Sequence, residues 1–115
     1  MESLAIDRII FGELCEAVGD EFAFELVDTF IEETPGILAE MRAALATADA
    51  DSYRRAAHSL KANGKTFGAL EFADLARAAE LGGFSGDSGR DVAAVDAIEE
   101  SYEAAAAVLK ALPRG

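Results

Sequence analysis

The chain is poor in several residue types: its 115 residues include no tryptophan, one cysteine, one histidine and two prolines. Because a single cysteine, Cys15, cannot form an internal disulfide, a disulfide framework is excluded. There is also no apolar run of about 18 residues, as in a membrane span, and no basic segment followed by an apolar one, as in a secretion signal. We therefore expect a cytoplasmic protein without a membrane-bound segment.

Basic residues are scarce as well. The chain has 10 Lys and Arg against 22 Asp and Glu, which gives a formal net charge of -12. General binding to nucleic acids or to anionic membranes needs a positive surface that displaces counterions. The charge balance therefore excludes both classes, and any positively charged partner site must be local.

Length and composition indicate one all-α domain. A chain of 115 residues is close to the usual size of a single domain, so we expect one domain over residues 1–115. Hydrophobic residues make up 51% of the chain, and many of them are alanines. This composition suits closely packed helices better than a sheet of β-branched residues.

Apolar residues recur at steps of three, four or seven, which predicts five helices. The first is short and begins after Asp7, the second spans about residues 20–47, and the third runs from Asp49 or Asp51 to about residue 66. The fourth helix begins near residue 70 and ends at two glycines. The composition of residues 82–90 predicts a loop, and the fifth helix follows this loop and ends before residue 113. We expect Pro35 to kink the second helix without ending it, because the apolar stripe keeps its phase there.

Four longer amphipathic helices with short connections predict an antiparallel four-helix bundle, with the short N-terminal helix packed across one end. Each long helix has one apolar stripe and no second stripe for a permanent partner, so we expect a monomer.

The single histidine, His58, lies within a cluster of basic residues. Four of the ten basic residues of the chain are nearby, namely Arg54, Arg55, Lys61 and Lys65. Residues 51–68 contain these four cations and one acidic residue, so the segment has a formal charge of +3. A helical residue advances by about 100°, which places His58 about 160° from Leu60 at the centre of the buried stripe. Lys61, Lys65 and Ala62 fall on the same outer side as His58. The cluster is therefore predicted to be a surface patch.

An exposed charged helix face is ordinary in proteins, and a lone histidine on it usually has no function. Two details favour a function here. The patch is a basic island on an acidic surface, and Ala62 and Gly64 are small residues that leave the imidazole uncovered. Since free imidazole has a pKa of about 6.5, such a side chain offers a nucleophilic nitrogen at neutral pH.

The stretch HSLKANGKTFGAL, beginning at His58, resembles the signature of histidine-containing phosphotransfer (HPt) domains of multistep two-component signalling. In that family the histidine is followed by a variable residue, an apolar residue and a lysine, and ten and eleven positions later by glycine and alanine. Here these positions are Leu60, Lys61, Gly68 and Ala69. The stretch FIEETPGILAEMRAAL, residues 30–45, also resembles the second long helix of the family, including its proline. The resemblance covers about residues 7–81.

The resemblance implies a histidine phosphotransfer protein that relays a phosphoryl group between receiver-domain aspartates. It implies that His58 is the phosphoacceptor, that Lys61 stabilises the phosphate, and that Ala62 permits close approach. Members of the family are relay intermediates without an ATP-binding part, so we expect no cofactor in this chain and magnesium on the partner receiver domain. The expected partners are response-regulator receiver domains, with a hybrid histidine kinase as a further candidate.

Two departures from the family pattern concern docking. Many members have glycine at the position of Ala62, and many have a small residue at the position of Lys65. Candidate partner-binding residues are the exposed members of the patch together with two apolar residues that lie off the centre of their helix's core stripe: Arg54, Arg55, Ala62, Lys65, Phe24 and Ile31. The two apolar residues could equally bury the first helix.

Three other interpretations compete with the relay. A helical protein-binding adaptor, a degenerate HPt-like module with an inert His58, has the same periodicity. A metal site is disfavoured, because His58 has no cysteine or carboxylate three or four residues away in its own helix. A nucleophile pair of Cys15 and His58 is also disfavoured, because Cys15 lies on an apolar-periodic helix and free cysteines are usually buried.

Overall fold

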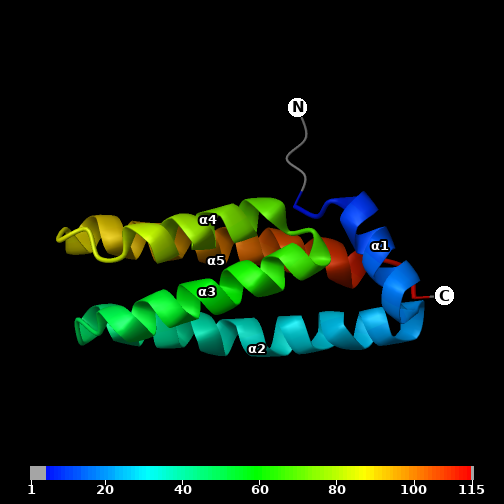
Figure 1. Ribbon diagram of the computed structural model, residues 1–115, viewed down its shortest axis with the longest axis horizontal. Helices are drawn as coiled ribbons and strands as arrows, with labels where there is room; N and C mark the ends of the chain where they lie inside the picture. Colours follow the sequence, from blue (N-terminus) through cyan, green and yellow to red (C-terminus); the bar gives the residue numbers. More distant parts are fainter. Residues whose placement is uncertain (1–4, 115) are drawn as a thin grey trace.

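The structure, a computed structural model that describes residues 5–114, is built of helices alone within that range (Figure 1). The five helices are α1 (Arg8–Val18), α2 (Asp20–Ala46), α3 (Ala50–Phe67), α4 (Leu70–Gly82) and α5 (Ser88–Ala111). The four longer helices run antiparallel to their chain neighbours, and α1 crosses the end of the bundle where α2 begins (Figure 1). The predicted all-α bundle with an additional N-terminal helix is confirmed. No helix in this range is both long enough and apolar enough to cross a membrane.

Aspartates fix where three helices begin. The Asp7 carboxylate accepts hydrogen bonds from the main-chain N–H groups of Ile9 and Ile10, and Asp49 and Asp87 cap α3 and α5 in the same way. The cap at Asp87 corrects one sequence prediction. The loop expected over residues 82–90 is shorter, because α5 already begins at Ser88 despite the glycine that follows it. The buried Asp91 carboxylate holds this loop by accepting bonds from the Ser85 N–H and hydroxyl.

Pro35 lies inside α2, which continues through it as one helix. Since proline has no N–H, the carbonyl of Ile31, four residues earlier, lacks its usual helical donor. The hydroxyl of Tyr102 on α5 donates to that carbonyl at 2.9 Å, and the Tyr102 side chain is otherwise buried in the core. The bond that the proline removes within α2 is thus replaced by a bond between α5 and α2.

The corner between α3 and α4 is the most tightly built part of the fold. A Cβ atom on Gly64 would lie 2.7 Å from the Phe72 ring and 3.2 Å from the Cβ of Ala73, so α3 and α4 approach closely there. Gly68 ends α3 in the left-handed conformation, with φ of 80°, and its carbonyl accepts a bond from the Asp7 N–H at 2.8 Å. Ala69 is fully buried. The glycine-alanine pair therefore sets the α3–α4 turn and seats the start of α1.

The replacement bond at Pro35 gives a stability prediction. Tyr102→Phe should lower the free energy of unfolding by about 1 to 2 kcal/mol, because the Ile31 carbonyl would lose its donor. In a Pro35→Ala background the N–H of residue 35 can donate to the Ile31 carbonyl. Tyr102→Phe should then lower the free energy of unfolding by less than half as much. Urea unfolding of the four proteins of this double-mutant cycle measures the difference. An equal cost in both backgrounds would show that the two features are independent.

Candidate functional site

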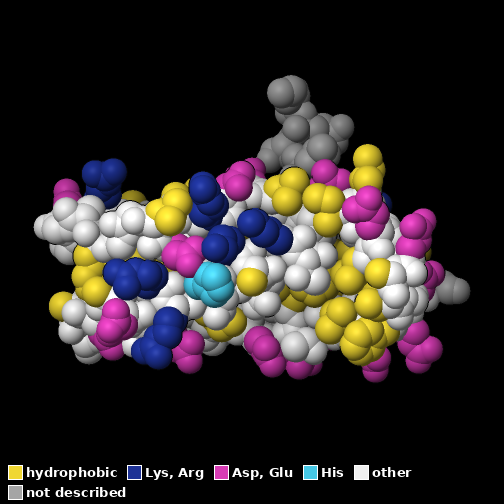
Figure 2. Space-filling view, in the orientation of Figure 1, with side chains coloured by type: hydrophobic (Ala, Val, Ile, Leu, Met, Phe, Trp, Pro, Cys, Tyr) yellow, Lys and Arg dark blue, Asp and Glu magenta, His cyan; other side chains and the backbone are white. Residues whose placement is uncertain are grey.

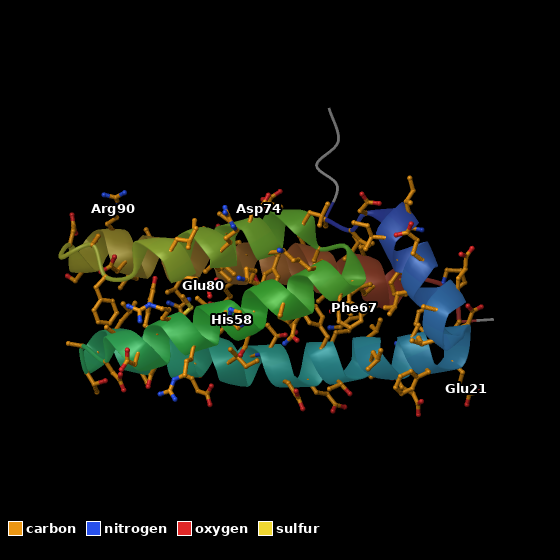
Figure 3. The ribbon with its side chains drawn as sticks, in the orientation of Figure 1. Glu21, His58, Phe67, Asp74, Glu80 and Arg90 are labelled. Atoms are coloured by element: carbon orange, nitrogen blue, oxygen red, sulfur yellow. The ribbon has the colours of Figure 1, made fainter. Side chains whose placement is uncertain are left out.

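His58 projects from the outer face of α3, midway along the bundle (Figure 3). Its neighbours in the helix that face inward, Ala57 and Leu60, are fully buried, whereas the imidazole side chain is 61% exposed. The helical arithmetic therefore placed the ring correctly. The ring is fixed at one point: its Nδ1 atom lies 2.7 Å from the Oε2 atom of Glu80 on α4.

Glu80 joins the two residues that the sequence singled out. Its other carboxylate oxygen, Oε1, accepts a bond from the Lys61 ammonium group at 2.7 Å, and its side chain is only 16% exposed. The bond from Lys61 and, secondarily, the bond from His58 lower the pKa of the Glu80 carboxyl below its ordinary value. Glu80 is therefore ionised at neutral pH and can only accept hydrogen bonds.

The ionised carboxylate determines the tautomer of the histidine. Because Glu80 can only accept, the Nδ1 atom of His58 must carry the proton that lies between them. A neutral imidazole then has its free lone pair on Nε2, on the other side of the ring. The site thus combines an exposed nucleophilic nitrogen, a carboxylate that orients the ring and a lysine cation, all on adjacent turns of α3 and α4.

Sequence reasoning missed Glu80, although a signal was present. It follows Ala73 by seven residues and Ala76 by four, so it lies on the buried stripe of α4. A carboxylate on an apolar stripe needs a partner, and the neighbouring helix offered His58 and Lys61. Pairing Glu80 with His58 and Lys61 requires the register between α3 and α4, and the periodicity of a single helix does not give that register.

The other predicted basic residues share the face of His58, where Lys and Arg side chains gather around the imidazole (Figure 2). Arg54, Arg55, Ala62 and Lys65 are all exposed on α3. Arg54 has a long contact of 3.5 Å with Asp51, and Arg55 lines a groove between α2 and α3 together with Ile37 and Ser59. The structure therefore brings the predicted patch together.

The two predicted apolar docking residues on α2 lie further away. Since Ile37 and Ser59 face each other across the groove, a rise of about 1.5 Å per residue puts Ile31 about 10 Å and Phe24 about 20 Å along the bundle from His58. Phe24 is half-buried, with its ring against that of Phe11 and under the guanidinium of Arg114. Ile31 is also half-buried. Their role in docking stays a prediction, and Phe24 has an evident role in holding α1.

A nucleophile pair between Cys15 and His58 does not form, because α1 crosses the end of the bundle and His58 lies midway along α3 (Figures 1 and 3). Burial, assisted by Asp20, raises the pKa of the Cys15 thiol, which makes it less reactive. Within residues 5–114, no three His, Cys, Asp or Glu side chains are grouped so that they could hold a metal ion.

Comparison with known proteins agrees with this geometry. A family model of the Hpt domain matches residues 25–108. The structure also matches the crystal structure of histidine-containing phosphotransfer protein B from Pseudomonas aeruginosa PAO1, with a TM-score of 0.85 and 27% sequence identity. That match covers 95% of this chain and 94% of the other. A search of curated proteins found no match. The chain therefore belongs to the Hpt domain family, the histidine phosphotransfer proteins of phosphorelay signalling.

Proposed function

We propose that His58 is the phosphoacceptor of this relay protein and that its Nε2 atom carries the phosphoryl group. The observation that supports this most directly is the 2.7 Å contact between Nδ1 and Glu80 on an imidazole that is otherwise 61% exposed. A carboxylate that fixes the proton on Nδ1 leaves Nε2 as the nucleophile, and the exposure lets a partner's active site reach it.

The transfer step follows from this arrangement. The Nε2 lone pair attacks the phosphorus atom of an aspartyl phosphate on the partner, the bond from phosphorus to the aspartate oxygen breaks, and the aspartate leaves as a free carboxylate. The imidazole becomes a cation that keeps its proton on Nδ1. Glu80 accepts that proton's hydrogen bond and stabilises the positive charge, and transfer to a second receiver reverses the same steps.

Lys61 is the second member of the proposed site. It follows His58 by about one helical turn, or about 4.5 Å along the axis. Its ammonium group has three N–H donors, so it can keep its bond to Glu80 and still donate to a phosphoryl oxygen. We infer that Lys61 offsets part of the negative charge that the phosphoryl group brings, and that Ala62 leaves room for the partner's active site.

The remaining requirements of phosphoryl transfer fall to the partner. In-line transfer needs an oxygen atom on the side of the phosphorus opposite Nε2, and the negative charge of the phosphoryl oxygens must be neutralised. The receiver aspartate supplies that oxygen atom, and its magnesium ion neutralises the charge. Members of the family interact with receiver domains and kinases in phosphorelays. We therefore propose a monomeric relay intermediate with no cofactor of its own, served by receiver domains and a hybrid histidine kinase. An inert adaptor would give no reason for the bonds that join His58, Glu80 and Lys61.

The acceptor can be tested by substitution. Incubation with a panel of phosphorylated receiver domains should place acid-labile label on the wild-type protein and none on His58→Gln. Because the imidazole is exposed, the free energy of unfolding should change by no more than about 0.5 kcal/mol. Label retained by the variant, or loss of its helical fold by circular dichroism, would contradict an exposed acceptor at residue 58.

The orienting role of Glu80 can be tested separately from its role in packing. Glu80→Gln keeps an oxygen that can accept from Nδ1, whereas Glu80→Ala does not. We expect nitrogen chemical shifts of the imidazole to show the Nδ1–H tautomer in wild type and Glu80→Gln, and a mixture of tautomers in Glu80→Ala. Transfer should slow by about tenfold in Glu80→Ala, equal to about 1.4 kcal/mol. Identical imidazole spectra for all three proteins would refute the orienting role.

The lowered pKa of Glu80 also predicts a pH dependence of stability. A carboxyl group whose pKa is lower in the folded state stabilises the fold above its ordinary value of 4.5 and loses that effect as pH falls through the lowered value. The difference in stability between wild type and Glu80→Gln should therefore be constant above about pH 6 and shrink below about pH 4.5. Subtracting the variant removes the contribution of the other carboxyl groups. A difference that grows on acidification would have the wrong sign.

A further inference from the structure

The ion pairs of this acidic protein leave some cations without a partner. Among residues 5–114, four cations have a carboxylate within 4.0 Å, namely Arg42, Arg54, Lys61 and Arg114. Within that range the other six have no such carboxylate, although the chain contains 22 acidic residues, and Lys65 and Arg77 are two of these six. Arg77 even has Asp74 one turn before it on the same helix, a spacing that allows an ion pair.

Two of these cations, Lys65 and Arg77, flank the proposed site on two helices. The contacts of Gly64 with Ala73 and of His58 with Glu80 fix the register of α3 against α4. In this register Arg77 is level with Lys61, and Arg77 is exposed about one turn before Glu80 on α4. Lys65 is exposed about one turn after Lys61 on α3.

The face of α4 that carries Arg77 also carries apolar surface. Leu81 follows Arg77 by four residues, so the two side chains lie on the same side of the helix. Leu81 is 69% exposed, although it is the immediate neighbour of Glu80. A cation beside exposed apolar area is more typical of a protein-binding surface than of a site for a small anion.

We propose that Lys65 and Arg77 form a docking rim for receiver domains whose surface beside the phosphorylated aspartate is acidic, and that this rim determines which receivers exchange phosphoryl groups with His58. The proposal rests on the proposed function. It assigns to α4 a part in partner selection that the motif on α3 does not include.

Charge complementarity is the physical reason for an acidic partner surface. A receiver binds magnesium beside its aspartate, and magnesium sites are built from carboxylates. The rest of this protein is strongly acidic, so an acidic receiver surface is attracted to the His58 face and repelled elsewhere. Charges at the rim of an interface act mainly on the association rate, and salt screens them.

The matched pair of variants is Arg77→Glu and Arg90→Glu, which make the same change in net charge. Arg90 lies at the end of the bundle away from α1, distant from His58 (Figure 3), and its guanidinium group has no carboxylate within 4.0 Å among residues 5–114. A receiver domain that exchanges with wild type serves as the probe. At about 50 mM salt, Arg77→Glu should associate roughly tenfold more slowly and Arg90→Glu less than twofold, and both differences should shrink at about 500 mM salt. Lys65→Glu should act like Arg77→Glu.

A charge swap on the partner completes the test. Replacing an acidic residue beside the receiver's aspartate by lysine should restore rapid association with Arg77→Glu and slow it with wild type. Arg77→Gln, which removes the charge without reversing it, should show a smaller loss than Arg77→Glu. Equal association of Arg77→Glu and Arg90→Glu at low salt, or a loss in Arg77→Glu that high salt does not reduce, would overturn the rim.

Failure of the rim and failure of the proposed function give different results. Wild type that takes label on no histidine, either from receivers or from potassium phosphoramidate as a small donor, would contradict the acceptor itself. Wild type that takes label on His58 from a receiver, combined with unchanged association of Arg77→Glu, would contradict the rim alone.

Discussion

The carboxylate of Glu80 is the interaction on which the proposed site depends. It binds His58 through one oxygen and Lys61 through the other, and both contacts measure 2.7 Å. Without it, the imidazole would be an exposed side chain free to choose either tautomer, and Lys61 would be a mobile surface cation. With it, one neutral imidazole nitrogen is defined as the nucleophile, and a positive charge is held about one helical turn away.

Glu80 can do this only because α3 and α4 pack closely. The absent side chain of Gly64 lets Phe72 and Ala73 approach, and the left-handed Gly68 turns the chain so that α4 returns directly alongside α3. Adding a Cβ at Gly64 would press on the Phe72 ring at 2.7 Å and would move α4, with Glu80 on it, away from His58. The glycines of the motif thus act on the histidine through the position of the neighbouring helix.

Much of the bundle could be predicted from the sequence, because each helix carries its own periodicity and three begin at a capping aspartate. The outward direction of His58 followed from the same periodicity. Three features could not be predicted, and all of them lie between elements: the bond from Tyr102 to the Ile31 carbonyl, the contact of Glu80 with His58, and the level position of Arg77 beside Lys61. Each depends on the register between two helices, which tertiary packing sets. The early start of α5 was missed for a local reason, since glycine and serine composition outweighed the cap at Asp87.

The charges of the site suit a group that must both accept and release a phosphoryl group. In the proposed mechanism Glu80 favours the imidazolium cation that would form on phosphorylation of Nε2, but its negative charge would repel the phosphoryl oxygens. Lys61 attracts those oxygens, but it disfavours the neighbouring cation. Because the two opposite charges are bonded to each other, their effects on the phosphorylated state largely cancel. In the proposed mechanism the phosphohistidine is then neither strongly stabilised nor strongly destabilised by its own protein, and we infer that the docked receiver domain determines the direction of transfer.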